Sequence, residues 1–572
     1  MNFTSIVATT EYISTLQAHL THETMTQEAD LLLTNGLVFN PFTLEWTHES
    51  IAIQDGRIIG LGMYPAKRVQ DCSGFYIVAG FIDAHAHIES SFLSPREYSI
   101  LAAQHGTTTT IADPHEIANV CGTQGIQYMQ QNHCMTDIRY TLPSCVPATS
   151  MDACAQPLCA ATLSTFLKTD SSIIALGEVM NVPGVLAGEP DLMQKLDLLS
   201  CREGHAPMLT GSELDAYINA GIQSDHETNT YLEGYEKLRR GMYLYIRQGS
   251  TEKNLPELIS LATYATAPRC CFCTDDRDVI ELMQRGAIDD CIRLAIAHGC
   301  EPEIAYRIAT LSAAERFALH DQGACTPGRR ADLVILSDKQ KCIIHDVLLC
   351  GISYRALEVS PPPKTPVYPF HATIPSPSDI RLSGSGIATV IALHHHHIDT
   401  TAMEVPVHGE QVPDLARDIL KVIVVSRYTP HKIGIGLVHG FSMKRGAIAS
   451  SVSHDSHNII AVGTSDEEIC AALAAVIEHK GGVAIVDGKE SNILPLPIGG
   501  LMSDISASSL NEKLGEIENC AVKCGACPHA FMYLSFLALT VIPEVRITER
   551  GVFDGRKCED IPLFSQTQAL FM

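Results

Sequence analysis

A repeated strand–helix unit between residues 77 and 325 constrains this chain more than any other feature of its sequence. Eight such units at a spacing of roughly 20–35 residues predict an α/β fold, a (β/α)8 TIM barrel. The same alternation also fits a doubly wound sheet, which counting units alone does not exclude. The apolar, strand-like runs begin near Ile77, Thr107, Arg139, Ile173, Ser200, Ala220, Met242 and Arg269.

Strand-rich segments on both sides of the barrel complete the predicted architecture. Residues 31–75 alternate apolar and polar side chains around turns, and similar runs return at 328–336, 342–351 and 353–359. A Pro-rich stretch at 361–370 indicates a linker. The expected domains are an N-terminal extension (1–27), a small composite β domain (28–76 plus 326–365), the barrel (77–325) and a C-terminal mixed α/β domain (375–572).

Composition narrows the class of protein. A formal net charge of -25 repels a phosphate backbone, so we expect no nucleic-acid partner. No apolar run approaches the length of about 18 residues that a membrane span needs, and the N-terminus lacks a signal-peptide pattern. Twenty cysteines in 572 residues are too sparse for a disulfide scaffold. We therefore expect a cytoplasmic protein with free thiols and no membrane partner.

Two histidines close the first expected barrel strand. His85 and His87 are two residues apart, so on a strand both imidazoles point to the same face. The C-terminal ends of barrel strands are where enzymes of this fold place their sites. A His-x-His pair also occurs by chance as two surface histidines. Its position after the apolar run IVAGFIDA favours a pair of metal ligands.

Further donor side chains recur at the ends of other expected strands. Taken singly, each fits a hydrogen-bonded loop residue as well as a metal ligand. With the histidine pair they make six donors on strands one, four, five, six and eight, which chance explains poorly. Imidazole with carboxylate suits Zn, Mn or Fe(II). The additional donors are Glu178, His205, His226 and Asp275.

Longer motifs are more specific than this donor pattern. They are VAGFIDAHAHIESS, TTTTIADPHEIANVCG, GEVMN, GHAP, SDHE, CTDDRD and PGRRADLVIL, followed by IGIGLVHGFSMKRGAIASSVSHDSHNIIAVG and LPLPIGGLMSD. Together they resemble the adenine deaminase family of the amidohydrolase superfamily. The resemblance covers roughly residues 30–560, whereas residues 1–27 match no known pattern.

The resemblance implies a metal-dependent hydrolase that converts adenine to hypoxanthine and ammonia. It implies that His85, His87 and Asp275 bind the more buried of two divalent metals and that His205 and His226 bind the second. Many relatives bridge the two metals with a carboxylated lysine on strand four, where this chain has Glu178. The resemblance points to manganese or iron, with zinc also compatible. We expect adenine as the small-molecule partner, and a homo-oligomer, dimeric or larger.

Deamination also needs groups that move protons. We expect Asp275 to accept a proton from the attacking hydroxide. The motif Asp113-Pro114-His115-Glu116 offers His115 and Glu116 as carriers toward purine N1, and Glu116 is favoured because a carboxylic acid can hand a proton across that edge. The alternative for this motif is a turn with an Asp cap. We expect Asp276 to point away from Asp275 if the last strand continues through it.

Other residues are candidates for holding the base. Glu89, Ser90 and Ser91 follow the metal histidines and could line the base pocket with Asp113, or they could simply begin the first loop and helix. In the C-terminal segment, His454 and His457 could reach over the barrel mouth to the substrate, or stabilise a tight turn.

Two further motifs and two rival functions compete with this interpretation. Cys524 and Cys527 lack the second ligand pair of a structural zinc site. Cytidine-type deaminases pair H-x-E with P-C-x-x-C, whereas here Lys523 precedes Cys524 and no fitting H-x-E lies upstream. The run His394–His397 is expected to be a solvated loop. The rival functions are another amidohydrolase acting on a cyclic amide or an N-acetyl sugar, and a non-catalytic barrel scaffold. The distinctive C-terminal segment argues against the first, and six converging donors argue against the second.

Overall fold

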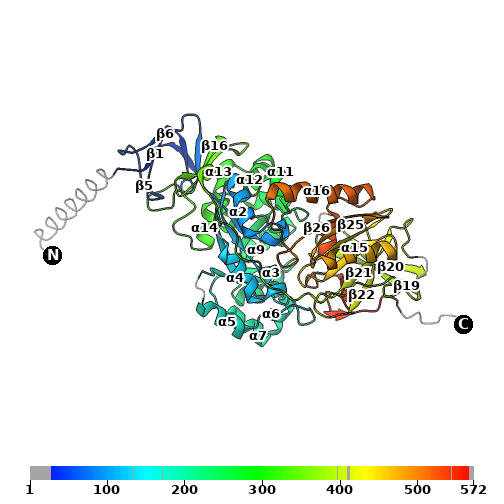
Figure 1. Ribbon diagram of the computed structural model, residues 1–572. Coiled ribbons are helices and arrows are strands. Elements are labelled where there is room, and N and C mark those ends of the chain that lie inside the picture. Colours follow the sequence, from blue (N-terminus) through cyan, green and yellow to red (C-terminus); the bar gives the residue numbers. More distant parts are fainter. Residues whose placement is uncertain are drawn as a thin grey trace, which may run out of the picture.

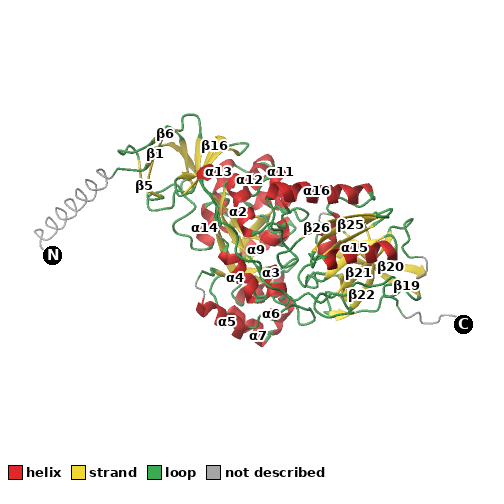
Figure 2. Cartoon of the chain, viewed as in Figure 1, coloured by secondary structure: helices red, strands yellow, loops and turns green. Residues whose placement is uncertain are grey.

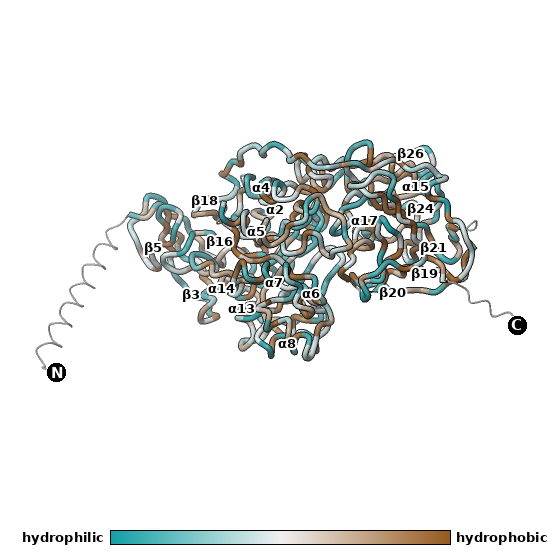
Figure 3. Tube along the Cα trace, turned by 90° about the horizontal axis from the view of Figure 1, so that it is seen from below, coloured by the Kyte–Doolittle hydropathy of each residue, from teal (hydrophilic) through white to brown (hydrophobic). Residues whose placement is uncertain are grey.

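The computed structural model describes residues 28–132, 134–169, 172–395, 397–408, 412–542 and 544–565. The chain forms three domains arranged in a row, with a small β domain at one end, a barrel in the middle and the C-terminal domain at the other end (Figure 1). Helices surround the strands of the middle body (Figure 2), and the view from below shows the same order (Figure 3). The extension expected at residues 1–27 lies outside the described residues. Within the described part of the chain, no helix is long and apolar enough to cross a bilayer.

The small β domain combines strands from before and after the barrel in one sheet. In it, β7 pairs in parallel with β2 and antiparallel with β16, where Val78 lies opposite Val334. Its two sheets have the orders β5-β4-β1-β6 and β18-β17-β16-β7-β2-β3. The strands are β1 (Leu31–Thr34), β2 (Leu37–Asn40), β3 (Glu45–His48), β4 (Ile51–Gln54), β5 (Arg57–Leu61), β6 (Val69–Asp71), β7 (Tyr76–Ala79), β16 (Leu333–Asp338), β17 (Ile343–Leu349) and β18 (Ile352–Ser353).

The prediction of a strand at 353–359 is mostly wrong. Strand β18 covers only Ile352–Ser353, and a 3-10 turn, η4 (Tyr354–Ala356), follows it. Residues 357–384 form no helix or strand, which fits the linker expected there.

Eight parallel strands close into a ring, which confirms the TIM barrel over the doubly wound sheet. Strands β8 to β12 form one run and β13 to β15 another. The seam between β8 and β15 is closed by a parallel bridge between Ala86 and Asp275, and Gln223 N donates to Arg202 O (3.2 Å) across the other seam. The strands are β8 (Phe81–Ala86), β9 (Thr107–Ala112), β10 (Asp137–Leu142), β11 (Ala175–Val179), β12 (Arg202–Gly204), β13 (Ser224–Asp225), β14 (Tyr243–Arg247) and β15 (Cys270–Cys273).

The run expected to begin the barrel near Ile77 is two strands. Residues before Gly80 pair inside the small β domain, whereas Phe81 begins the barrel and pairs with Thr107. Gly80 marks the change of partner, and a Cβ there would lie 2.0 Å from Thr108 Oγ1. The run is apolar throughout because both halves are buried, so hydrophobicity alone does not reveal the break.

Helices follow the barrel strands at the expected positions. Ser94 caps α2 by accepting a hydrogen bond from Glu97 N, and Pro95 occupies its first turn. The long stretch after β15 is two helices, because Gly286 adopts a φ of 100° that ends the first. The barrel helices are α2 (Pro95–Gln104), α3 (His115–Cys121), α4 (Thr123–Gln131), α5 (Ala160–Thr169), α6 (Val182–Ala187), α7 (Pro190–Leu196), α8 (Gly211–Asn219), α9 (Tyr231–Arg239), α10 (Leu255–Leu258), α11 (Val279–Arg285), α12 (Ile288–Ala297), α13 (Pro302–Ile308) and α14 (Leu311–Arg316).

The C-terminal domain is built on a mixed eight-stranded sheet of order β20-β19-β22-β21-β24-β23-β25-β26. Its central strand, β21, is buried at every residue, as the apolar run predicts. Helix α15 (Asp466–Glu478) packs on β23, β24 and β25. The strands are β19 (Ser385–Leu393), β20 (Thr400–His408), β21 (Ile419–Val425), β22 (Ile433–His439), β23 (Ala447–Ser450), β24 (Ile459–Gly463), β25 (Gly482–Asp487) and β26 (Glu490–Pro495), with a small sheet of β27 (Val545–Thr548), β28 (Gly551–Asp554) and β29 (Glu559–Asp560).

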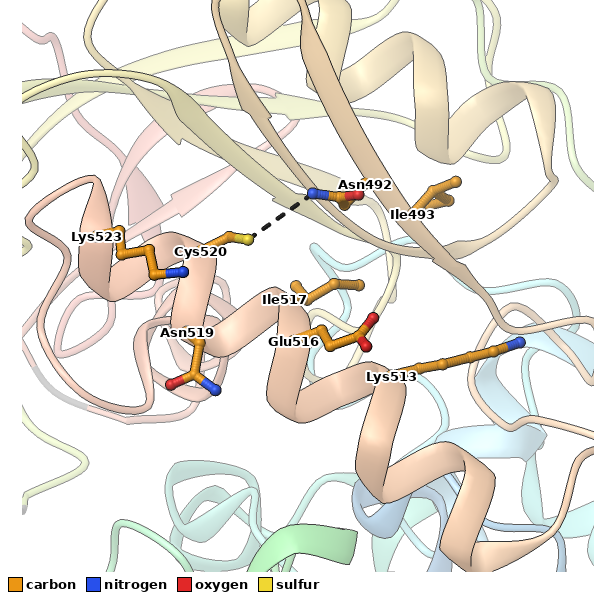
Figure 4. Close-up of a pocket in the computed structure, with 8 residues that line it drawn as sticks. All are labelled: Asn492, Ile493, Lys513, Glu516, Ile517, Asn519, Cys520 and Lys523. Atoms are coloured by element: carbon orange, nitrogen blue, oxygen red, sulfur yellow. Dashed lines mark hydrogen bonds between the residues drawn. The ribbon is translucent and has the colours of Figure 1, made fainter.

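Helix α16 (Ala507–Lys523) reaches from the barrel to the C-terminal sheet (Figure 1). Its first residue is tied to the barrel, since Ala507 N donates to Glu97 Oε2 (3.3 Å). On its outer side, a groove of about 470 Å³ separates it from β26, and Asn492 Nδ2 donates to Cys520 Sγ (3.8 Å) across this groove (Figure 4). No residue of the predicted site lines the groove. Helix α17 (Ala530–Phe536) follows α16 and is buried throughout.

Candidate active site

The six predicted metal ligands converge at the C-terminal ends of the barrel strands. His85 lies in β8 and Glu178 in β11, whereas the others directly follow their strands or, for Asp275, lie two residues beyond. None of the six is more than 5% exposed. Uncompensated charges are costly to bury, so a buried group of four imidazoles and two carboxylates calls for tight pairing or a bound cation.

One half of the cluster is formed by His85, His87 and Asp275. The two Nε2 atoms lie 3.1 Å apart, and Asp275 Oδ1 lies 3.4 Å from His85 Nε2 and 3.2 Å from His87 Nε2. Each residue therefore directs a donor atom at the same small space. The backbone reinforces this geometry, because Asp275 N donates to His85 O (3.0 Å) and His87 N donates to Asp275 O (3.1 Å).

Glu178 faces both halves of the cluster. Its Oε1 lies 3.2 Å from His87 Nε2, while its Oε2 lies 2.8 Å from His205 Nδ1 and 3.3 Å from His226 Nε2. Burial disfavours the ionised carboxyl, but hydrogen bonds from His205, His226 and His87 hold the pKa of Glu178 well below its usual range. Glu178 is thus an anion placed between two groups of imidazoles, as a bridging ligand requires.

The donor geometry fits divalent metal. In four overlapping sets, one donor atom from each residue lies within 4.8 Å of the others. Imidazole and carboxylate are the ligands that Zn, Mn and Fe(II) share. His205 Nε2, although buried, has no hydrogen-bond partner among the described residues. The sets are His85, His87 and Asp275; His85, Glu178 and His226; His87, His115 and Glu178; and His205, His226 and Glu227.

Two residues that the sequence did not single out hold Asp275 in place. Arg247, at the end of β14, donates from Nη1 to Asp275 Oδ2 (2.6 Å) and from Nη2 to Glu227 Oε2 (3.0 Å). All three side chains are buried. Although burial opposes ionisation, the charges of Arg247 and then His226 hold the pKa of Asp275 well below its usual range. The sequence signal that could have identified Arg247 is its position as a charged residue at the end of the apolar run YLYI.

Asp276 does not behave as strand alternation predicts. Strand β15 ends at Cys273, and Asp275 has a left-handed φ of 54°. The chain therefore turns, and Asp276 is also buried at the site, where it accepts a hydrogen bond from Ser90 Oγ. The condition that the strand continue is not met, so the alternation between Asp275 and Asp276 does not apply.

Glu116 is held by both domains. It lies in the first turn of α3, and both His454 Nδ1 and His457 Nε2 from the C-terminal domain form hydrogen bonds with its carboxylate. Burial opposes ionisation, but His454, His457 and His115 hold the pKa of Glu116 well below its usual range. The two C-terminal histidines thus reach over the barrel mouth, and the group they contact in this structure is Glu116.

His115 connects Glu116 to the metal cluster. Its Nε2 lies 3.4 Å from Glu116 Oε1, and its Nδ1 lies 3.5 Å from Glu178 Oε1. Two further residues that sequence reasoning missed, Cys145 and Asp455, share a 4.8 Å cluster with it. Burial raises the pKa of the Cys145 thiol well above its usual range, so Cys145 lies here as a neutral thiol.

The other predicted pocket residues differ in what they contact. Asp113 Oδ2 accepts from Glu178 N (2.9 Å), which positions the backbone of Glu178. Glu89 Oε1 accepts from Ile117 N (3.1 Å), and burial raises the pKa of this acid to about 7. Ser91 Oγ donates to Ile88 O (2.5 Å) within the turn η1 (Ile88–Ser91), a local structural contact. Their roles toward substrate stay predictions.

The remaining sequence candidates lie away from this centre. All twenty cysteines are free thiols. Cys524 is the C-cap of α16, and Cys527 N donates to Phe441 O (2.9 Å). In the histidine run, His394 Nδ1 lies 2.8 Å from Asp399 Oδ2, and its side chain is 38% exposed.

Comparison with known proteins agrees with this geometry. The Amidohydrolase family model matches residues 76–353, and the Adenine deaminase C-terminal domain model matches residues 397–559. An adenine deaminase of Methanoculleus marisnigri is 52% identical over 516 residues, covering 90% of this chain and 99% of its own length. The chain belongs to the adenine deaminase family. Another member, from Methanoregula boonei, is 48% identical and covers 94% of this chain and 97% of its own length. The family resemblance inferred from the motifs is confirmed.

Proposed function

We propose that this member of the adenine deaminase family hydrolyses adenine to hypoxanthine and ammonia. The observation that carries the proposal is the position of Glu116 beside the six-donor cluster, where the C-terminal domain holds it. The names of the relatives supply the substrate, and the matched C-terminal domain disfavours an amidohydrolase acting on a cyclic amide or an N-acetyl sugar.

We propose that two divalent ions, Mn(II), Fe(II) or Zn(II), occupy the cluster. His85, His87 and Asp275 would hold one ion, His205 and His226 the other, and Glu178 both. When bound, such ions lower the pKa of water from 15.7 to about 7, which supplies a nucleophile at neutral pH.

The protein side chains then move protons while the water oxygen adds to C6 and the bond from C6 to the amino nitrogen breaks. Asp275, oriented by Arg247, accepts a proton from the attacking water. That proton then passes to the leaving amino nitrogen, which departs as ammonia. Glu116 starts as a carboxylate, so it first accepts the second proton of the water and then passes it to N1. His115 lies between Glu116 and Glu178 and can relay protons between the two ends of the site.

The direct test is to mix metal-loaded protein with adenine and follow the ultraviolet change to hypoxanthine, with ammonia measured in parallel. We expect one ammonia released for each hypoxanthine formed. Dihydropyrimidines and N-acetylglucosamine serve as control substrates for the rival amidohydrolase reactions. Turnover of a control substrate without turnover of adenine would reject the proposal.

We predict that adenine is a far better substrate than adenosine. The site is sealed between the barrel and the C-terminal domain, and a ribose on N9 adds bulk and hydroxyls that need room and hydrogen-bond partners. The measurement is kcat/KM for each compound with the same metal-loaded preparation. A higher kcat/KM for adenosine would exclude a pocket for the free base.

We predict that Glu116→Gln lowers turnover by about 10²–10⁴-fold, the usual range for loss of a general acid or base. Its metal content should stay near normal, because Glu116 contacts histidines rather than the six-donor cluster directly. Glu178→Gln is the matched comparison and should lose metal, since an amide is a weaker, uncharged bridge. Elemental analysis and kinetics on the same samples separate metal binding from proton transfer. A metal-free Glu116→Gln protein would show that Glu116 is a metal ligand rather than a proton carrier.

We also propose a cytoplasmic homo-oligomer, dimeric or larger, with no nucleic-acid partner. Free thiols and a net charge of -25 support the compartment and the absence of nucleic acid. Light scattering on the purified chain gives the mass of the assembly, and a monomer at micromolar concentration would contradict the oligomer.

A further inference from the structure

A small pocket at the domain boundary touches the buried site directly. Its wall includes Ser90, which donates to Asp276, and His454, which is bonded to Glu116. The six predicted ligands themselves are closed to solvent. Substrate therefore reaches them only after part of the surrounding wall moves, and this pocket leads from the boundary between the domains to two residues that contact catalytic candidates.

The pocket wall is mainly apolar. Phe92 comes from the barrel loop after η1, Leu514 from α16, and Phe531 and Met532 from α17, so both domains contribute. Aromatic and aliphatic side chains offer flat, weakly hydrated surfaces that favour the face of a heterocycle. A charged or heavily hydroxylated ligand would lose hydration there without full compensation.

Two acidic residues complete the wall. Asp278 caps α11, and Glu518 lies on α16. Burial, and then the nearby charge of Asp278, raise the pKa of Glu518 to about 8. Near neutral pH, Glu518 is therefore an uncharged acid that can both donate and accept a hydrogen bond at the edge of a ring.

The pocket is too small for a purine in this structure. Its volume is about 20 Å³, room for roughly one water molecule. Admission of a purine thus requires movement, and α16 has space to move into. The groove of about 470 Å³ lies on the opposite side of the same helix, lined by Lys513, Glu516 and Asn519 among others (Figure 4).

We propose that this pocket is the vestibule through which a flat, uncharged heterocycle reaches the metal centre, and that α16 opens it by shifting toward the groove. The identity of the heterocycle as adenine rests on the proposed function. The route itself does not, because it follows from the closed site, the shared wall residues and the free space behind the helix.

Tryptophan substitutions on the two sides of α16 test the route. Leu514→Trp fills the vestibule, whereas Asn519→Trp places the same bulk on the groove side. We expect Leu514→Trp to lower kcat/KM for adenine by at least about tenfold, equivalent to about 1.4 kcal/mol of added barrier. It should also slow the loss of metal from the holoenzyme to phenanthroline, a flat heterocyclic chelator. Asn519→Trp, which occupies the groove into which α16 moves, should slow both rates as well, and wild-type rates in this variant would contradict the movement of α16.

A cavity-forming variant provides the opposite test. Leu514→Ala widens the vestibule and should speed metal loss to phenanthroline, while retaining a cooperative thermal transition. Wild-type rates of metal loss in both Leu514 variants would overturn the route. If the wild-type protein did not deaminate adenine but metal loss still followed this pattern, the result would support the vestibule and reject adenine as the substrate.

Discussion

Exhaustive removal of divalent metal should abolish adenine deamination and lower the melting temperature of the chain. Without cations, the four buried imidazoles of the cluster have three carboxylates beside them, and one of these, Glu227, is also paired with Arg247. A ligand that binds only the folded state stabilises it, by about 4 kcal/mol at a thousandfold excess over Kd. The measurements are elemental analysis, turnover and Tm before and after chelation. Mn(II) or Fe(II) should restore both activity and Tm.

The matched control is Glu178→Gln treated in the same way. Because this variant lacks the bridging anion, added metal should raise its Tm less than that of the wild type. Full activity in a wild-type preparation shown to be free of metal would contradict the proposed centre. Restored Tm without restored turnover would show that metal stabilises the folded protein without taking part in the reaction.

The parts of the structure that sequence predicted well share one physical property, a strong local pattern. Buried parallel strands are continuous apolar runs, and in a closed barrel their C-terminal ends meet at one face. A polar residue that ends such a run is therefore placed in space by its position alone. This reasoning located His85, His87 and Glu178, and the structure brings the same residues together.

The parts that sequence missed depend on contacts between distant segments. His454 meets Glu116 across 338 residues, and no local pattern fixes how the C-terminal domain docks on the barrel. Arg247 is a similar case, since its role depends on the barrel closing around Asp275. The split of the first strand at Gly80 was hidden because burial on both sides makes the two strands look alike.

The prediction for Asp276 was conditional on the strand continuing, and that condition is not met. Alternation applies only while the backbone stays extended, and the left-handed φ of Asp275 ends it. An aspartate tolerates this conformation better than a bulky or β-branched residue does. Such local strain is concentrated at functional sites, where surrounding contacts over-determine it. Here the backbone bonds of Asp275 to His85 and His87 supply those contacts.

Asp275→Asn should reduce turnover by about 10⁴-fold, the upper end of the range for loss of a general acid or base. The variant keeps the size of the side chain and one neutral ligand oxygen, but it loses the anion that Arg247 orients and that accepts the proton. Adenine binding should survive better than kcat, because the base pocket itself is unchanged. The measurement is kcat and KM under saturating Mn(II), with metal content determined on the same samples.

Asp276→Asn is the control that separates the two neighbouring acids. Asp276 faces Ser90 at the edge of the vestibule and is absent from the three-donor sets described above, so its amide should raise KM more than it lowers kcat. Asp275→Asn should show the reverse, because its loss is felt in the transition state rather than in binding. Near-normal turnover in Asp275→Asn together with loss of turnover in Asp276→Asn would assign the proton-accepting role to Asp276. The opposite pattern assigns catalysis to the carboxylate of Asp275, which the backbone bridge to β8, Arg247, His85 and His87 hold in place.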